Sequence, residues 1–328
     1  MERLVPLVSI EDLRVAFSFG NKEATVLRGI NLSVLKNEIH GLVGESGSGK
    51  TVTSTCIMRL LPIPPGKILS GHIYFDGKDL LSLTEEQMRT YRGRRIAMIF
   101  QEPAKYLNPA FKIGEQIIEM LMLHMKMHKQ SACKRAIELL KLVGLDEKVI
   151  DKYPHELSGG MKQRAMIAMA ISCDPDLIIA DEPTTALDVT LQVQILALLK
   201  KLKDMRKLGV LFISHDLYLV SEIADRVSVI YAGRIVESAT KEELFRNPLH
   251  PYTRLLMHSI PDAKKKGSKL ATIPGQVPDA AEIGNGCAFA NRCPIAKEDC
   301  FNDIPSYVAY ENAHTVACYY AGKIWQIL

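Results

Sequence analysis

The 328-residue sequence lacks the features of several common protein classes. It has no run approaching the ~20 apolar residues that a membrane-spanning helix needs. Its net charge of +4 is too weak to predict a nucleic-acid-binding protein, which would carry a clustered basic face. Acidic residues at Glu2, Glu11 and Asp12 argue against a secretory signal. We therefore expect a soluble, cytoplasmic protein, which can still dock on a membrane protein.

The bulk composition is that of an ordinary globular protein. Apolar residues make up 47% of the chain and charged residues 24%. The chain is long for one domain, so a core with an appendage is expected.

One stretch matches the P-loop pattern G-x-x-x-x-G-K-[ST] without a mismatch: Gly44, Glu45, Ser46, Gly47, Ser48, Gly49, Lys50 and Thr51. Residues 38–43 before it predict a short buried strand, and residues 52–61 after it predict a helix. In that context the glycines let backbone N–H groups turn toward a phosphate chain. Lys50 then reaches the β- and γ-phosphates, and the Thr51 hydroxyl is placed to ligate Mg²⁺. The stretch predicts a protein that binds a nucleoside triphosphate.

The rest of the chain alternates strands with helices. Residues 7–35 predict a small antiparallel sheet, and residues 112–150 predict two amphipathic helices. Buried parallel strands and a separating helix follow at 177–180, 189–206, 210–213 and 227–230. The pattern predicts an α/β fold with an antiparallel β subdomain and a helical insertion.

Two carboxylates, Asp181 and Glu182, end the apolar run 177–180. Asp181 at a strand end can hold Mg²⁺, usually through water. Glu182 would orient or deprotonate the water that attacks the γ-phosphate. Two acids at a helix start are the structural alternative, but that alternative does not explain an acidic pair directly after four buried residues.

A second glycine-rich segment, Ser158-Gly159-Gly160, precedes a long Ala/Met/Ile helix. Ser158 is a candidate N-cap, and the two glycines leave bare N–H groups at the positive helix end. Because a simple cap needs no paired glycines, we predict an anion site here.

These motifs, in this order, resemble those of the nucleotide-binding subunits of ATP-binding cassette (ABC) transporters. Residues 157–161 resemble the LSGGQ signature, with Met161 in place of the glutamine. Four further residues match family positions, namely the Q-loop Gln101, the D-loop Asp188, the H-loop His215 and the adenine-stacking Phe17. Phe19 is the alternative aromatic residue, and a core role is the alternative for either ring.

The resemblance implies a P-loop (RecA-like) ATPase that sandwiches two ATP molecules in a head-to-tail dimer. In such a dimer Gln101 senses the γ-phosphate and Mg²⁺, and His215 contacts the γ-phosphate. Ser158 and Gly160 face the γ-phosphate bound by the other subunit.

A narrower resemblance is to the oligopeptide/dipeptide importer branch. It rests on the segments 153–156 and 247–253 and on a long tail with Asn291-Arg292-Cys293-Pro294. The segment 104–106 departs from that branch, which commonly has Met-Thr-Ser there. The branch implies a peripheral ATPase on the cytoplasmic face of the inner membrane. Its partners would be a sister ABC ATPase, or a second copy of this chain, two membrane permease subunits and, indirectly, a substrate-binding protein. A nickel or metal-chelate importer and a soluble, non-transport ABC ATPase are the alternatives.

Four of the seven cysteines fall in the last 42 residues, with the spacing C-x5-C-x6-C-x17-C: Cys287, Cys293, Cys300 and Cys318. In a cytosolic chain such a cluster indicates a metal site before disulfides. The spacing lacks the C-x2-C pairs of common ferredoxin or zinc-ribbon sites. In the peptide-importer branch these cysteines resemble the ligands of a [4Fe–4S] cluster. Zinc and free or oxidised thiols remain open.

We expect three parts: a catalytic core at 1–102 and 158–250, a helical subdomain at 103–157 and an extension at 251–328 with the cysteine site.

Overall fold

The structure is a computed structural model that describes residues 5–20, 22–185, 187–259, 273–310 and 313–322. The chain forms two compact units. The first unit holds residues 1–7, 34–39 and 82–213, and the second holds residues 8–33, 40–81 and 214–328.

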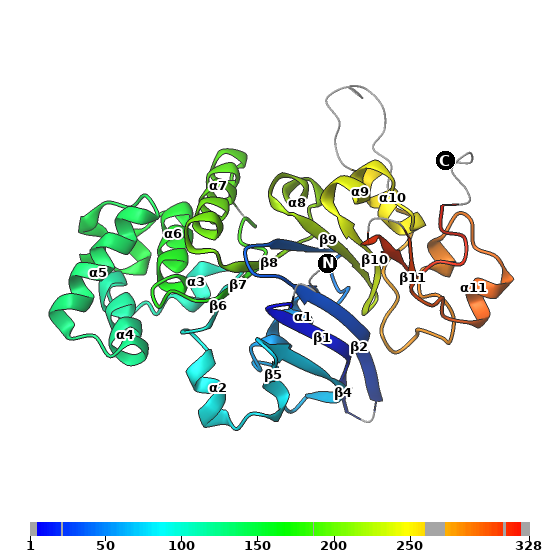
Figure 1. Ribbon diagram of the computed structural model, residues 1–328, viewed down its shortest axis with the longest axis horizontal. Coiled ribbons are helices and arrows are strands. Elements are labelled where there is room, and N and C mark those ends of the chain that lie inside the picture. Colours follow the sequence, from blue (N-terminus) through cyan, green and yellow to red (C-terminus); the bar gives the residue numbers. More distant parts are fainter. Residues whose placement is uncertain (1–4, 21, 186, 260–272, 311–312, 323–328) are drawn as a thin grey trace. The chain divides into compact units, whose positions relative to one another are not determined.

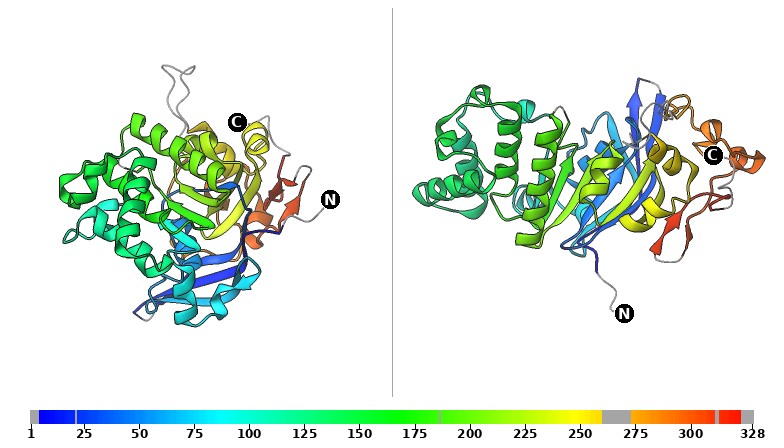
Figure 2. Two further views of the ribbon diagram at one scale, coloured as in Figure 1. Left: turned by 60° about the vertical axis from the view of Figure 1, so that its left-hand side comes forward. Right: turned by 90° about the horizontal axis from the view of Figure 1, so that it is seen from above.

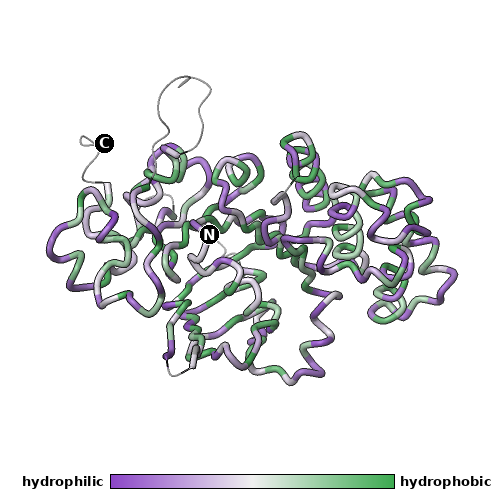
Figure 3. The backbone as a smooth tube through the Cα atoms, turned by 180° about the vertical axis from the view of Figure 1, so that it is seen from behind, coloured by the Kyte–Doolittle hydropathy of each residue, from purple (hydrophilic) through white to green (hydrophobic). Residues whose placement is uncertain are grey.

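The first unit contains three parallel strands, in the order β8-β7-β6. Their bounds are Ile96–Ile99 for β6, Leu177–Asp181 for β7 and Gly209–Ser214 for β8. Every residue of the three strands is buried. Because both faces of such strands are covered, they form continuous apolar runs in the sequence rather than alternating patterns. Figure 3 shows that hydrophobic (green) and hydrophilic (purple) stretches alternate along the chain.

Helices make up most of the remainder of this unit (Figure 1): α2 (Glu85–Tyr91), α3 (Pro103–Tyr106), α4 (Ile113–Met125), α5 (Lys129–Leu142), α6 (Gly159–Ala170) and α7 (Val189–Arg206). Two 3₁₀ turns, Glu147–Asp151 and Pro154–Glu156, precede α6. Helices α4 and α5 lie within the predicted helical insertion, and α7 has the predicted bounds 189–206.

The second unit begins with the four-stranded sheet β2-β1-β4-β5. Its strands are β1 (Val8–Phe19), β2 (Lys22–Val34), β4 (Gly66–Phe75) and β5 (Lys78–Asp79), and the 3₁₀ turn Leu80–Ser82 follows them. Strands β1 and β4 are antiparallel, with Val8 opposite Phe75 and Phe17 opposite Gly66. Strands β1 and β2 of the predicted sheet 7–35 are neighbours, whereas β4, the antiparallel partner of β1, lies outside the predicted range.

A further set of strands in this unit runs in the order β11-β12-β10-β9-β3. Strand β3 (Ile39–Val43) is parallel to β9 (Arg226–Tyr231), which is antiparallel to β10 (Arg234–Thr240). The hairpin of β11 (Val308–Ala309) and β12 (Thr315–Val316) adds to β10 through β12 and lies beside it in Figure 2. The sequence did not predict that the C-terminal tail extends a sheet.

The helices of the second unit are α1 (Lys50–Ile57), α8 (Leu217–Ile223), α9 (Lys241–Arg246), α10 (Pro251–His258) and α11 (Glu298–Asn302), with a 3₁₀ turn at Ala290–Arg292. Helix α1 begins at the P-loop lysine and ends at Ile57, so the predicted helix 52–61 is wrong at both ends. Arg59 has a left-handed φ of 49°, and Pro62 disfavours helix at the residue before it.

Within the described ranges, no helix is long and apolar enough to cross a membrane. Residues 260–272 of the predicted extension, and Ala186 beside Asp188, lie outside the described residues.

Candidate nucleotide-binding and hydrolysis site

The P-loop connects β3 to α1 in the second unit, as the sequence predicted. Its lysine folds back onto the loop, because Lys50 Nζ donates hydrogen bonds to the carbonyl oxygens of Gly44 (2.8 Å) and Glu45 (3.0 Å). Lys50 is only 5% exposed. A fixed ammonium beside exposed backbone N–H groups is the arrangement that binds a polyphosphate.

Two features show why the loop sequence is so restricted. A Cβ at Gly44 would overlap the carbonyl oxygen of Ile230 on β9, so only glycine fits there. The Ser48 hydroxyl is fully buried and has no hydrogen-bond partner among the described residues. A buried hydroxyl without a partner is unfavourable unless a ligand satisfies it, and a phosphate oxygen can do so.

The other residues predicted in this unit lie on separate elements. Phe17 is on β1 and is partly exposed. His215 is exposed directly after β8, in the connection to α8. Thr51 is exposed in the first turn of α1, where its hydroxyl oxygen suits a hard cation such as Mg²⁺.

In the first unit the structure brings Gln101 and Glu182 together. Gln101 Nε2 donates a hydrogen bond of 2.8 Å to Glu182 Oε2, and Thr185 Oγ1 donates another of 3.0 Å to the same oxygen. The two donors therefore fix one carboxylate oxygen of Glu182. Sequence reasoning missed Thr185, although it lies three residues after Glu182 in the turn that leaves β7.

Glu182 also has an unusual backbone. Its φ is 45°, in the left-handed region that residues with side chains seldom adopt. Its N–H donates to the carbonyl oxygen of Ile213 on β8 (2.9 Å), which holds that conformation against the sheet. Asp181, the last residue of β7, is only 3% exposed. The two acids thus differ in position: Asp181 is buried at the end of β7, and Glu182 lies on the turn that follows.

The signature segment begins α6. The Ser158 hydroxyl accepts a hydrogen bond from the Met161 N–H (3.3 Å), which confirms the predicted N-cap. Asp188 caps α7 in the same way by accepting from the Leu191 N–H (2.9 Å). A Cβ at Gly160 would approach Leu191 at 2.9 Å, so the two helix starts pack closely. Gly159 is exposed at the start of α6, as an anion-binding terminus requires.

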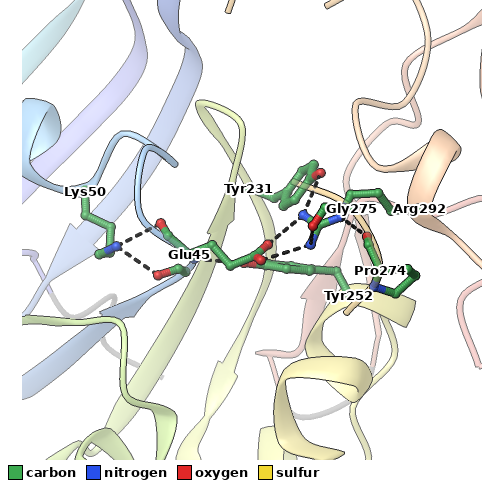
Figure 4. A network of polar contacts seen from close by, with 8 residues as sticks. Glu45, Lys50, Tyr231, Tyr252, Pro274, Gly275 and Arg292 are labelled. Carbon is green, nitrogen blue, oxygen red and sulfur yellow. Dashed lines mark hydrogen bonds and ion pairs between the residues drawn. The ribbon is translucent and has the colours of Figure 1, made fainter. Parts of the chain in front are cut away.

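Sequence reasoning missed a network at Glu45 in the second unit. Figure 4 shows Glu45 between Lys50 and Arg292, a residue of the C-terminal extension. Arg292 Nη1 and Nη2 donate to the two carboxylate oxygens of Glu45 at 2.7 and 2.9 Å. The Glu45 N–H donates to the hydroxyl of Tyr252 on α10 (2.9 Å). The only sequence signal was the resemblance of the segment around Arg292 to the peptide-importer tail.

The extension also shares buried aromatic packing with β9. The rings of Tyr231, Tyr252 and Phe289 lie 4.6 to 5.3 Å apart, centre to centre. All three side chains are essentially buried. The tail therefore packs through Phe289, although the sequence indicated a segment too irregular to build a core without a staple.

A buried carboxylate joins β10 to two later segments. Glu237 is fully buried and accepts from the N–H groups of Leu249 (2.6 Å) and His250 (3.0 Å). His314 Nε2 lies 2.7 Å from the same carboxylate. Burial lowers the pKa of His250 to about 4, so its ring is neutral at pH 7 and its Nδ1 accepts the Tyr252 N–H.

The four tail cysteines are free thiols within electrostatic range of one another. The Cys287 N–H donates to the Cys300 carbonyl oxygen (2.8 Å). Burial raises the pKa of Cys293 to about 11 and that of Cys318 to about 12, so both are protonated at neutral pH.

The expected metal site is not preformed at these cysteines. In the described part of the chain, no three His, Cys, Asp or Glu side chains converge to hold a metal ion. One zinc ion would need its ligand sulfurs within ~4 Å of one another, since each Zn–S bond is about 2.3 Å. A four-iron cluster binds each cysteine through a different iron, so its ligands lie farther apart. Since no such group of side chains is brought together in the described residues, the structure does not support the expected [4Fe–4S] cluster.

Comparisons with known proteins identify the family of the chain. Residues 27–185 match the ABC transporter family, and residues 236–300 match the oligopeptide/dipeptide transporter C-terminal region. Among solved structures, a dimeric ATP-binding cassette in a post-hydrolysis state with ADP and Pi is 28% identical, with a TM-score of 0.65. That likeness covers 71% of this chain and 98% of the cassette.

Curated relatives match along nearly the whole length. A probable peptide ABC transporter ATP-binding protein of Sinorhizobium fredii is 48% identical, over 97% of this chain and 96% of its own. The oligopeptide transport protein OppD of Bacillus subtilis is 47% identical, over 96% and 89%. The dipeptide transport protein DppD of the same organism is 43% identical, over 95% and 94%. The chain belongs to the ATP-binding subunits of ABC transporters, in the oligopeptide/dipeptide branch.

Proposed function

We propose that this chain hydrolyses ATP to drive the import of oligopeptides or dipeptides through membrane permease subunits. The observation that carries the ATPase activity is Glu182, a strained acid whose carboxylate is fixed by Gln101 and Thr185. The peptide substrate is supported by the relatives, which are named for peptide, oligopeptide and dipeptide transport.

The predicted residues of the nucleotide site have the following roles in this proposal. Lys50 and the P-loop N–H groups bind the phosphates, and Thr51 and Asp181 supply oxygen ligands for Mg²⁺. Glu182 orients and deprotonates the attacking water. Gln101 and His215 respond to the γ-phosphate, and Phe17 stacks on the adenine. Mg²⁺, when bound, neutralises the charge that develops on the transferred phosphate.

The proposed working form is a head-to-tail dimer with a sister ABC ATPase. Capping fixes the start of α6, so Ser158 and Gly160 can present N–H groups to the nucleotide of the other subunit. Hydrolysis then removes the γ-phosphate contacts and releases the dimer.

The proposed contact with the permeases is the segment that follows β6. Phe100 and Tyr106 stack with ring centres 3.8 Å apart, and Tyr106 remains 55% exposed. Phe111 and Leu123 are also exposed, at 51% and 58%. Exposed large apolar side chains of this kind are typical of a partner surface. The departure at residues 104–106 therefore falls on the surface that would select the partner. The chain would sit peripherally on the cytoplasmic face of the inner membrane.

We further propose that Cys287, Cys293, Cys300 and Cys318 ligate a [4Fe–4S] cluster in the C-terminal extension. The extension would follow a catalytic core at 1–102 and 158–250 and a helical subdomain at 103–157. Because ATP-driven transport needs no redox step, a structural staple is the simplest role for the cluster.

Affinity purification from detergent-solubilised membranes tests the transporter. The tagged chain should bring down multi-span subunits and a second ATPase chain. Phe111→Asp should reduce their recovery, whereas Val308→Asp, a substitution at a 47% exposed residue of the other unit, should not. Recovery of no membrane protein would favour a soluble ABC ATPase instead.

An anaerobic visible spectrum with iron, sulfide and zinc counts tests the cysteine site. We expect a broad band near ~400 nm and about four irons per chain. Cys318→Ser should lower the iron content, and Cys133→Ser, outside the cluster, should not. A metal-free anaerobic protein, or one with about one zinc, would contradict the cluster.

A further inference from the structure

The P-loop contains one acidic residue, whose charge has the same sign as the phosphates that the loop has to bind. Glu45 is the only carboxylate among residues 44–51, a loop that has to bind a polyanionic phosphate chain. Two like charges a few ångströms apart repel one another. An unpaired carboxylate at this position would therefore weaken nucleotide binding.

Arg292 neutralises that carboxylate in a fixed geometry. The pair is bidentate, and its side chains are 6% exposed at Arg292 and 29% at Glu45. The guanidinium also donates to the Tyr231 hydroxyl (3.2 Å) and to the carbonyl oxygens of Pro274 (2.8 Å) and Gly275 (3.4 Å). Each of the three guanidinium nitrogens therefore donates at least one hydrogen bond, which fixes the position of the arginine.

The backbone of Glu45 is also held by hydrogen bonds. Its N–H donates to the hydroxyl of Tyr252, which is fully buried, and its carbonyl oxygen accepts from Lys50. Glu45 therefore has its N–H and carboxylate bound to residues 207 and 247 positions later in the sequence. Figure 4 shows this chain of contacts from Lys50 through Glu45 to Arg292.

We propose that Arg292 is a positioning residue for ATP binding, which neutralises and anchors Glu45 so that nucleotide affinity depends on the C-terminal extension. Arg292 acts through Glu45 and does not touch the nucleotide. The proposal rests on the nucleotide-binding part of the proposed function, and on neither peptide transport nor the cysteine cluster.

Equilibrium binding of MgATP to the purified full-length chain tests this role. Arg292→Met should raise the Kd about tenfold, since it leaves Glu45 charged and unpaired beside the phosphates. Arg292→Lys keeps the charge but loses the bidentate contact. Its Kd should therefore lie between those of wild type and Arg292→Met. Arg14→Met is the matched control, because it removes the same charge from an exposed ion pair with Asp12 elsewhere in the unit.

Two further measurements separate charge neutralisation from general packing. The double variant Glu45→Gln with Arg292→Met should bind MgATP within about threefold of wild type, because no unpaired charge remains. The Kd ratio of Arg292→Met to wild type should shrink as ionic strength rises from about 0.05 to about 0.5 M. A merely structural role predicts neither result.

The outcomes are distinct. A Kd for Arg292→Met within twofold of wild type, or a double variant that binds as weakly as the single one, would overturn the proposal. If Arg292→Met does not fold, the Kd of Arg292→Lys and its salt dependence decide in its place. A wild-type chain that binds no MgATP would instead refute the proposed function.

Discussion

Replacing Glu182 with glutamine separates ATP binding from ATP hydrolysis. Glu182 Oε2 accepts hydrogen bonds from Gln101 and Thr185. A glutamine has nearly the same volume and keeps one oxygen that can accept both, so the backbone and the contacts of the turn should persist. The variant loses only the ability to take a proton from water.

The expected magnitude follows from that difference. General base catalysis contributes about 10²- to 10⁴-fold to a rate, which corresponds to about 3–5 kcal/mol of barrier. We expect the turnover number of Glu182→Gln to fall by that factor, while the Kd for MgATP changes by less than about threefold. Thr185→Val is the comparison variant, because it removes one orienting hydrogen bond and leaves the base. Its turnover should fall by less than about tenfold.

The assay is single-turnover ATP hydrolysis by the purified protein with the partners it carries, with equilibrium MgATP binding on the same samples. If Glu182→Gln retained more than a tenth of the wild-type turnover, Glu182 would not be the base. If its MgATP affinity collapsed together with the rate, the residue would instead be structural.

Three other perturbations test separate features of the second unit. Burial lowers the pKa of His250 to about 4, so the native state binds fewer protons than the unfolded state and stability should fall as pH drops from about 6.5 to about 4. Urea unfolding should show that wild type loses about 2 kcal/mol more than His250→Asn between pH 7 and pH 5, and equal losses would contradict the assignment. Glu237→Gln turns an amide N–H₂ toward a buried donor and should destabilise the protein by about 3 kcal/mol, whereas a loss below about 1 kcal/mol would mean that the site relaxes. The added Cβ of Gly44→Ala overlaps the Ile230 carbonyl oxygen, so this variant should bind MgATP more than about tenfold more weakly. The control Gly284→Ala, whose Cβ meets nothing within 4 Å, should bind MgATP as wild type does.

The parts of the fold that the sequence predicted are those with local causes. The P-loop follows a buried strand, and α7 keeps its helical pattern from Val189 to Arg206, because each depends on neighbouring residues. The end of α1 was wrong because a left-handed Arg59 ends the helix, and the apolar pattern does not encode that angle.

The site shows the same division. The motifs and the family resemblance predicted a role for Gln101 and a role for Glu182. The hydrogen bond between the two side chains, which are 81 residues apart, was not predicted. The pair of Glu45 and Arg292 spans 247 residues and belongs to no spacing pattern, so only the folded chain reveals it. The cysteine spacing likewise identified four thiols but not what they hold.

The carboxylate of Glu237 has a consequence for how the protein is made. Its partner His314 lies 77 residues later, so a ribosome adding about 5–20 residues per second takes about 4–15 s to supply it. Until then, burying Glu237 would leave part of its hydrogen-bonding capacity unmet, which is unfavourable. Strand β10 therefore reaches its final packing only after the C-terminal tail has been synthesised. A chain released before His314 would carry an exposed sheet edge at β10 and would be a natural target for chaperones and proteases.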